Sequence, residues 1–340
     1  MRRPWLIPFA PIYWLITSAR NSLFDLGILR SHAFDVPILC IGNLSAGGTG
    51  KTPHTEWVIQ QFKDKYRIAV LSRGYGRVTK GYIEADSTST ARDIGDEPLQ
   101  IHQKFPEVKV VVCENRVFGI EMLLSKDDAP EFIILDDAFQ HRYVNAGLKW
   151  LLTPWDDLYT KDYIIPLGNL REDIRGAERA DLITVTKCPA KPTPFERADL
   201  RKEIGPTDIQ TLGFSRMSYT PLVDAMNNEV ERPERAVVVT GIANPSPLLH
   251  HLESMGIECI HLSFPDHRQF TYADGQRILN ATESLEKPVV ITTRKDFVRW
   301  PTSDDLSAIP TYIQDIEIVM DDDGGVFTRI IERFISDFHD

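Results

Sequence analysis

The chain has 340 residues, of which 42% are hydrophobic and 26% are charged. That balance is typical of a folded protein with room for two domains, and it argues against a disordered or multispanning chain. The formal net charge of −11 argues against a general nucleic-acid-binding protein. The four cysteines are far apart in the sequence and include no C-x-x-C pair, which favours a reducing compartment over a zinc site or a disulfide framework.

The N-terminal residues differ in character from the rest of the chain. Residues 4–19 contain no charged side chain, whereas the four arginines and one aspartate of residues 1–30 give a local charge of +3. A spanning helix needs about 20 apolar residues, and prolines at 4, 8 and 11 interrupt this run. Aromatic rings beside arginine are typical of a membrane interface. We therefore predict an interfacial helix over residues 1–27. A helix docked on the protein's own core and a signal or spanning segment remain the alternatives.

A phosphate-binding loop is predicted after the apolar strand 38–41 and before a helix at 52–62. In such a loop, backbone N–H groups surround phosphate oxygens, a lysine adds positive charge, and a threonine offers its hydroxyl to Mg²⁺. The strict motif has glycine where this chain has Ser45, so a glycine-rich turn with a surface lysine is the other interpretation. The candidate nucleotide ligands are Ser45, Ala46, Gly47, Gly48, Thr49, Gly50, Lys51 and Thr52.

Short apolar strands alternate with helices from residue 36 onward. They are expected at 38–41, 68–71, 108–113, 132–135, 149–152 and 182–186. This alternation predicts an α/β fold resembling P-loop NTPases, with a mostly parallel sheet covered by helices on both faces. Ligands of such sheets gather at the carboxyl ends of the strands.

A second, smaller α/β unit is predicted after a less regular stretch at 217–234. Its strands are expected at 236–240, 257–262, 288–292 and 311–319, and a final helix is expected at 327–338. We assign residues 1–27 to the interfacial helix, 28–216 to the phosphate-loop domain and 217–340 to the smaller domain.

Acidic residues mark two further candidate sites. Asp136 and Asp137 directly follow the strand at 132–135, where a carboxylate near a phosphate loop can hold Mg²⁺. Asp96 stands in an acidic turn before a predicted helix. It can cap that helix or accept a proton from a substrate hydroxyl, and the spacing alone does not separate the two roles.

Arginine and histidine residues near the same predicted edge are candidate substrate ligands. The fork of a guanidinium group matches phosphate oxygens, which makes Arg73, Arg77, Arg116 and Arg171 candidates for binding a phosphorylated substrate. An exposed or capping role is an equal alternative for each of them. His267, in a turn of the second unit, is either a proton carrier or a solvated surface residue.

Taken in chain order, these motifs resemble the tetraacyldisaccharide 4′-kinase family, the lipid A 4′-kinases of Gram-negative bacteria. The matching stretches are Gly42–Pro53, Leu71–Gly76, Gly95–Pro98, Asp136–His141, Pro166–Glu172, Thr240–Pro245, Phe264–His267 and Thr293–Asp296. They span most of the chain. The chain departs from the usual family pattern at Ala138, Arg268 and Arg294, where the family commonly has a glycine, a second histidine and an acidic residue.

The resemblance implies an ATP- and Mg²⁺-dependent kinase, held peripherally at the cytoplasmic face of the inner membrane. It implies transfer of the γ-phosphate to the 4′-hydroxyl of an acylated glucosamine disaccharide 1-phosphate. By family pattern, Asp96 is the base and His267 its partner, while Lys51, Thr52, Asp136 and Asp137 serve phosphate and metal. No nucleic acid and no obligate protein partner are expected.

Two other classes of function stay open on the residues alone. One is a phosphate-loop ATPase that drives a partner protein, and the other is a membrane-surface adaptor with a vestigial loop.

Overall fold

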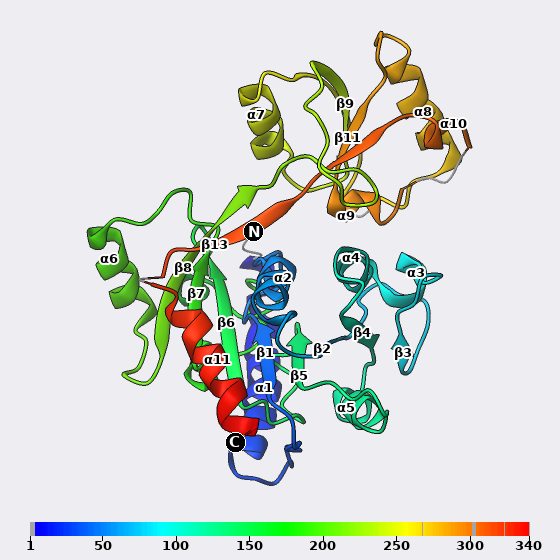
Figure 1. Cartoon of the computed structure of the whole chain (residues 1–340). Helices are drawn as coiled ribbons and strands as arrows, with labels where there is room; N and C mark the ends of the chain where they lie inside the picture. The colour runs from blue at the N-terminus through cyan, green and yellow to red at the C-terminus, as the bar shows by residue number, and fades with distance from the viewer. Residues whose placement is uncertain (1–3, 267, 301–303, 323, 340) are drawn as a thin grey trace.

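The computed structural model describes residues 4–266, 268–300, 304–322 and 324–339, which form two sheets with their helices (Figure 1). The strands of the large sheet are β1 (Ile38–Gly42), β2 (Ile68–Ser72), β3 (Ile83–Glu84), β4 (Lys109–Val112), β5 (Phe132–Asp136), β6 (Leu148–Pro154), β7 (Leu182–Thr186), β8 (Thr211–Tyr219) and β13 (Ile316–Met320). Those of the small sheet are β9 (Arg235–Thr240), β10 (Glu258–Ser263), β11 (Val290–Thr293) and β12 (Thr311–Gln314).

The large sheet has the order β13-β8-β7-β6-β1-β5-β2-β4-β3, and the small sheet has the order β10-β9-β11-β12. All pairings are parallel except the two at the edges of the large sheet, β13 with β8 and β3 with β4. Parallel strands place their carboxyl ends on one edge, so the loops after β1, β2 and β5 lie together. The predicted α/β class, with a second smaller unit and an N-terminal helix, is confirmed.

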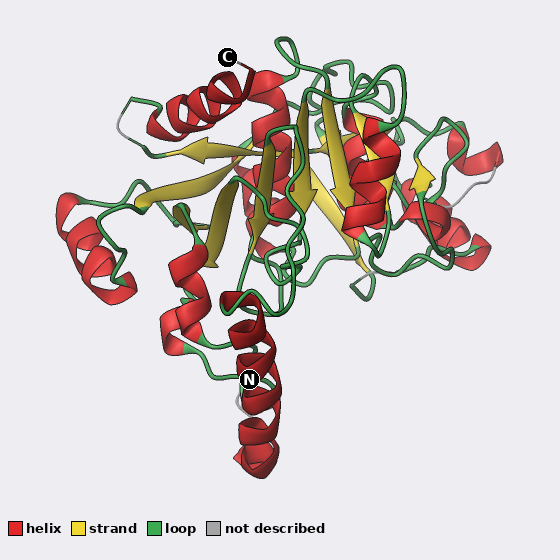
Figure 2. Cartoon of the chain, turned by 90° about the horizontal axis from the view of Figure 1, so that it is seen from below, coloured by secondary structure: helices red, strands yellow, loops and turns green. Residues whose placement is uncertain are grey.

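Helices cover both faces of the large sheet (Figure 2). The α-helices are α1 (Ala10–Asp25), α2 (Lys51–Phe62), α3 (Ala91–Ile94), α4 (Asp96–Lys104), α5 (Arg116–Leu124), α6 (Pro194–Ile204), α7 (Ser246–Ser254), α8 (Tyr272–Thr282), α9 (Arg294–Phe297), α10 (Asp304–Ser307) and α11 (Val326–His339). The 3₁₀ helices are η1 (Pro4–Phe9), η2 (Tyr159–Lys161) and η3 (Ile174–Arg179).

The central strands bury side chains on both faces, which explains their unbroken apolar sequences. On one face, Leu39 and Ile41 of β1 pack in a cluster with residues of α2 and α11. On the other face, Ile38 and Cys40 pack in a cluster with residues of α5. Because side chains alternate along a strand, one short apolar run fills both layers of the core. This double burial fixes β1 in the middle of the sheet and sets the phosphate loop at its end.

The last part of the chain returns to the large sheet. The strand expected at 311–319 is in fact two strands, because β12 belongs to the small sheet and β13 to the large one. The break falls at Asp315, whose carboxylate accepts from Ile316 N at 3.0 Å and pairs with Lys104 at 3.2 Å and Arg294 at 3.1 Å. Helix α11 then packs on β8, where a Cβ on Gly213 would lie 2.4 Å from the Phe327 ring.

The chain therefore crosses between the two sheets twice, once from β8 to β9 and once from β12 to β13. The predicted boundary between residues 216 and 217 falls inside β8. The division into separately moving domains stays a prediction. Arg294, one of the departures from the family pattern, is buried in this connection, where Asp315 compensates its charge.

The N-terminal helix α1 combines a docked side with an exposed apolar side. Phe24 is buried against Tyr143, with ring centroids 5.0 Å apart, whereas Ile12, Leu15 and Ile16 are 58%, 62% and 63% exposed. Figure 2 shows this N-terminal helix standing away from the sheet. Within the residues that the structure describes, no helix is both long and apolar enough to cross a bilayer.

Candidate functional site

The loop between β1 and α2 is supported by buried hydrogen bonds, and part of its backbone is exposed to solvent. Gly47 and Gly50 have φ of 134° and 89°, in the region that favours glycine. Asn43 Nδ2 donates to Thr49 Oγ1 at 2.9 Å, and Thr186 Oγ1 donates to the Thr49 carbonyl at 2.8 Å. Residues 46–48 remain exposed. A loop with buried supports and an exposed glycine-rich backbone at a helix N-terminus has the geometry of a phosphate cradle.

His54 connects the start of α2 to strand β8 of the large sheet. Its Nδ1 lies 2.7 Å from the Gly50 carbonyl, and its Nε2 lies 2.9 Å from Ser215 Oγ. Since a carbonyl only accepts, Nδ1 carries the proton and Nε2 accepts from the serine hydroxyl. Burial lowers the pKa of His54 to about 4, so the ring is neutral at physiological pH.

This histidine makes stability depend on pH. Its pKa of about 4 in the folded chain lies below the ordinary 6.5, so its contribution is complete above pH 6.5 and is lost as the pH falls toward 4. The loss amounts to about 3 kcal/mol of unfolding free energy. Urea unfolding at pH 7.5 and 4.5 should therefore show a smaller pH dependence in His54→Gln than in the unchanged chain. The control is His250→Gln, at an exposed position. An equal pH dependence in His54→Gln would contradict this account.

Asp136 and Asp137 lie at the end of β5, beside β1. Asp136 is fully buried, and its Oδ1 accepts from Thr55 Oγ1 at 3.3 Å. Its pKa is raised to about 7, mainly by burial and then by the carboxylates of Glu97 and Asp137, while Lys51 acts in the opposite direction. Among the described residues, Asp136 Oδ2 has no hydrogen-bond partner. A buried carboxylate oxygen without a partner, close to other carboxylates, fits a divalent cation.

The donor set at this position suits Mg²⁺ bound together with phosphate. Thr52 is buried at the first turn of α2, and Asp137 Oδ1 lies 3.6 Å from Lys51 Nζ. The described residues contain no preformed cluster of three or more His, Cys, Asp or Glu side chains around one point. Mg²⁺ commonly takes only one or two carboxylates and completes its shell with water and phosphate oxygens, so Thr52, Asp136 and Asp137 fit it.

The turn after this pair avoids the need for glycine at Ala138. The left-handed residue is Asp137, with φ of 49°, a conformation that aspartate tolerates better than most residues. Gly42 on β1 faces this turn, and a Cβ there would lie 2.6 Å from Phe139 Cβ. The close approach of the two backbones sets Asp137 next to the phosphate loop.

The segment 169–173 forms the other wall of the loop. Ala46 N donates to the Asn169 carbonyl, and Arg171 N donates to the Leu44 carbonyl, both at 2.7 Å. The Arg171 side chain then reaches Asp137 Oδ1 at 3.1 Å. The structure therefore brings Arg171 to the predicted metal carboxylates, as a partner of Asp137.

Asp96 begins α4 after Gly95, whose φ is 94°. Its Oδ2 lies 3.6 Å from Arg299 Nε, and Arg299 NH2 donates to Asp296 Oδ1 at 2.9 Å. The Arg299 side chain is fully buried, so the unit around the small sheet supplies a fixed cation to Asp96. No pattern around Arg299 in the sequence signals this contact. His267 lies outside the described residues.

Three arginines near His141 form a cationic cluster beside the carboxylates of Asp136 and Asp137. The pKa of His141 is lowered to about 4, mainly by burial and then by the charges of Arg116, Arg20 and Arg73, so its ring is neutral at physiological pH. Arg116 is buried, and among the described residues its Nε has no hydrogen-bond partner. We refer to Arg20, Arg73 and Arg116 as the cationic cluster. Arg20 comes from α1 and was not predicted.

Arg77 lies elsewhere in the same unit. Its NH2 pairs with Glu114 Oε1 at 2.6 Å and donates to the Gly81 carbonyl at 2.8 Å. The side chain is 3% exposed. These contacts close the loop after β2, so the structure places Arg77 in a supporting position.

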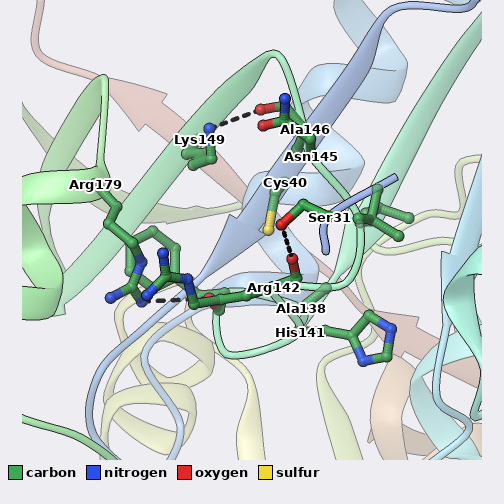
Figure 3. Close-up of a pocket in the computed structure, with 12 residues that line it drawn as sticks. Ser31, Cys40, Ala138, His141, Arg142, Asn145, Ala146, Lys149 and Arg179 are labelled. Atoms are coloured by element: carbon green, nitrogen blue, oxygen red, sulfur yellow. Dashed lines mark hydrogen bonds between the residues drawn. The ribbon is translucent and has the colours of Figure 1, made fainter. Parts of the chain in front are cut away.

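A cavity of about 300 Å³ lies behind the turn at 138–146 (Figure 3). Arg142, Lys149 and Arg179 line it, and the described lining includes no carboxylate. Each cation already has a partner: Arg142 pairs with Asp25, Arg179 with Glu172, and Lys149 donates to the Ala146 carbonyl. No residue of 45–52 is among its described lining, so the cavity is separate from the phosphate loop, and the two arginines are paired with carboxylates of the protein itself.

Comparisons with known proteins agree along nearly the whole chain. A family profile described as tetraacyldisaccharide-1-P 4′-kinase matches residues 2–335. The tetraacyldisaccharide 4′-kinase of Flavobacterium johnsoniae is 45% identical over 301 residues, covering 87% of each chain. That of Bacteroides thetaiotaomicron is 46% identical over 312 residues, covering 87% of this chain and 82% of the relative. The crystal structure of "apo" form LpxK from Aquifex aeolicus in complex with ATP superposes with a TM-score of 0.80 at 28% identity, covering 98% and 99% of the two chains.

Proposed function

The chain belongs to the tetraacyldisaccharide-1-P 4′-kinase family, and on that premise we propose how its residues carry out the reaction. It is an ATP-dependent kinase that transfers the γ-phosphate to the 4′-hydroxyl of an acylated glucosamine disaccharide 1-phosphate in lipid A biosynthesis. The observation that carries this conclusion is the family match from residue 2 to residue 335.

The direct test offers labelled ATP, Mg²⁺ and the disaccharide 1-phosphate in detergent micelles. Label should move to the lipid, and ADP should form in equal amount. ATP hydrolysis that requires a protein partner and does not depend on the lipid would favour an ATPase switch. Failure to bind Mg²⁺-ATP would favour an adaptor.

In the proposed mechanism, the loop 45–52 binds the phosphates of ATP through backbone N–H groups and Lys51. Mg²⁺ held by Thr52, Asp136 and Asp137 would neutralise the charge on the phosphate oxygens. Arg171 and Lys51 both pair with Asp137 Oδ1, at 3.1 and 3.6 Å. Positioning and charge neutralisation supply most of the rate in such transfers.

Asp96 orients the 4′-hydroxyl and accepts its proton as the oxygen bonds to the γ-phosphorus and the bond to ADP breaks. Arg299 helps to hold this carboxylate in position, because its Nε lies 3.6 Å from Asp96 Oδ2. His267 is the partner of Asp96 by family resemblance. Closure of the unit that carries Arg299 over the phosphate loop excludes water, which would otherwise hydrolyse ATP.

The cationic cluster is proposed to bind the phosphate already present on the lipid. Arg116 supports this role because it is buried beside Arg73 without a carboxylate bonded to its Nε among the described residues. Its NH1 donates to the Glu114 carbonyl at 3.1 Å, but a buried guanidinium nitrogen without an acceptor is unfavourable, so an anionic ligand is the natural partner of Nε.

Replacing Arg116 by glutamine should raise the KM for the lipid about 10- to 100-fold, since a charge-assisted hydrogen bond is lost. The KM for ATP should change little. Steady-state kinetics in mixed micelles measure both values, with the exposed Arg92→Gln as the matched control. A lipid KM that stays at the value of the unchanged chain would remove Arg116 from the phosphate site.

The exposed apolar side of α1 is proposed to bind the cytoplasmic face of the inner membrane peripherally. Ile12, Leu15 and Ile16 are more than half exposed, although burial of large apolar side chains is favourable. The aromatic and arginine residues around them suit the headgroup region.

The double variant Ile12→Gln/Leu15→Gln should therefore partition into anionic vesicles at least about 10-fold less well, because two exposed apolar side chains no longer enter the interface. Vesicle sedimentation measures this change. Ile209→Gln, at a position that is 85% exposed outside α1, is the control. Unchanged partitioning of the double variant would rule out this side of α1 as the anchor.

A further inference from the structure

The docked side of α1 is bonded to the segment that forms a wall of the phosphate loop. Three of its side chains donate to three consecutive residues: Tyr13 Oη to the Arg171 carbonyl at 3.0 Å, Asn21 Nδ2 to Glu172 Oε2 at 2.7 Å, and Trp14 Nε1 to Asp173 Oδ2 at 2.7 Å. Tyr13 and Asn21 are eight residues apart and share one helix face. The apolar residues that we assign to the membrane lie on the other side.

The same segment continues directly into the nucleotide site. The backbone of Arg171 is bonded to Leu44, and its guanidinium lies 3.1 Å from Asp137 Oδ1. Two hydrogen bonds therefore connect Tyr13 to the residues before the phosphate loop. The Tyr13 hydroxyl donates to the Arg171 carbonyl, and Arg171 N donates to the Leu44 carbonyl. A shift of α1 changes the position of Arg171, and with it the support of Asp137.

Glu172 gives the second connection. It is 3% exposed, and its carboxylate accepts from Asn21, from Gln140 Nε2 at 3.1 Å and from Arg179 NH2 at 2.8 Å. Gln140 also donates to the carbonyl of Asn43, the first residue after β1, at 2.7 Å. A buried carboxylate that loses one donor draws its remaining partners into a new arrangement, because an unsatisfied oxygen is costly.

We propose that Tyr13 and Asn21 are positioning residues of the ATP site. They hold Arg171 and Glu172 where these residues support the phosphate loop and Asp137. The proposal rests on the proposed function, since it takes this loop as the ATP site. Helix α1 then has two functions. Its apolar side binds the lipid surface, and its polar side keeps the nucleotide site at a fixed distance and orientation from that surface.

The test uses the full chain in detergent micelles with Tyr13→Phe, Asn21→Ala and the double variant. Each single change should weaken binding of a non-hydrolysable Mg²⁺-ATP analogue about 3- to 10-fold, as expected for one lost hydrogen bond. The double change should weaken it further and raise the KM for ATP, while the KM for the lipid and vesicle partitioning stay unchanged. The matched control is Thr17→Val, because the Thr17 hydroxyl bonds to the helix carbonyls of Tyr13 and Trp14.

Calorimetry gives the ATP affinity, and thermal unfolding of the same samples reports on folding. Unchanged ATP affinity in the double variant would overturn the proposal. Parallel losses of ATP affinity, lipid affinity and unfolding temperature would also overturn it, since they indicate a general structural role. Tyr13→Phe keeps the shape of the ring and guards against misfolding. Failure of the unchanged chain to bind Mg²⁺-ATP would instead contradict the proposed function.

Discussion

Replacing Asp96 by asparagine is expected to lower phosphate transfer about 10²- to 10⁴-fold, the usual contribution of a general base. Asparagine has nearly the same shape, and the N-cap of α4 is Gly95 and not Asp96, so the start of the helix is kept; but asparagine cannot take the proton of the 4′-hydroxyl. Binding of Mg²⁺-ATP should remain, because the phosphate loop lies on α2 and β1 rather than on α4. Transfer of labelled phosphate in micelles measures the rate, and calorimetry measures ATP binding.

The control for this variant is Asp93→Asn, three residues earlier in the same acidic turn. Asp93 accepts from the Thr90 backbone N at 2.9 Å in the capping box of α3, a role that asparagine can keep. Its transfer rate should therefore match that of the unchanged chain. Near-normal transfer in Asp96→Asn would remove Asp96 as the base, and equal losses in both variants would indicate damage to the turn.

Replacing Lys51 by alanine is expected to abolish transfer and to weaken ATP binding strongly. Lys51 begins α2, is mostly buried and lies 3.6 Å from Asp137 Oδ1, so it supplies charge to both the phosphates and the metal carboxylates. Lys63→Ala, at the far end of the same helix where the lysine pairs with Glu107, should keep normal transfer. Full transfer in Lys51→Ala would contradict the assignment of this loop.

The same variant has an expected pH signature. Lys51 lowers the pKa of Asp136, which burial and the neighbouring carboxylates nevertheless raise to about 7. Without the lysine this pKa rises, so more of the carboxylate is protonated at pH 7 and Mg²⁺ meets stronger competition from protons. Titration of Mg²⁺-dependent ATP binding at pH 7 and 8.5 should show a larger gain with pH in Lys51→Ala than in the unchanged chain. An equal gain would contradict the coupling.

Local signals were sufficient to predict the centre of the fold. The apolar run at 38–41, the glycines of the loop and the lysine at the helix start are neighbours in sequence, and their physical requirements are local. The same holds for Asp136 and Asp137 at the end of a strand. The strand predicted at 311–319 was wrong because the break at Asp315 depends on ion pairs with Lys104 and Arg294, which are distant in sequence.

The sequence by itself therefore determined the sheet type, the phosphate loop and the family of this chain. Only the tertiary structure decided which distant residues meet there. It placed Arg299 beside Asp96, both Arg20 and Arg116 near His141, and the segment 169–173 against both the loop and α1. The N-terminal helix illustrates the difference best. Its sequence shows that it is apolar and aromatic. Its polar side chains can bond to Arg171 and Glu172 only because folding brings these distant residues within hydrogen-bonding distance.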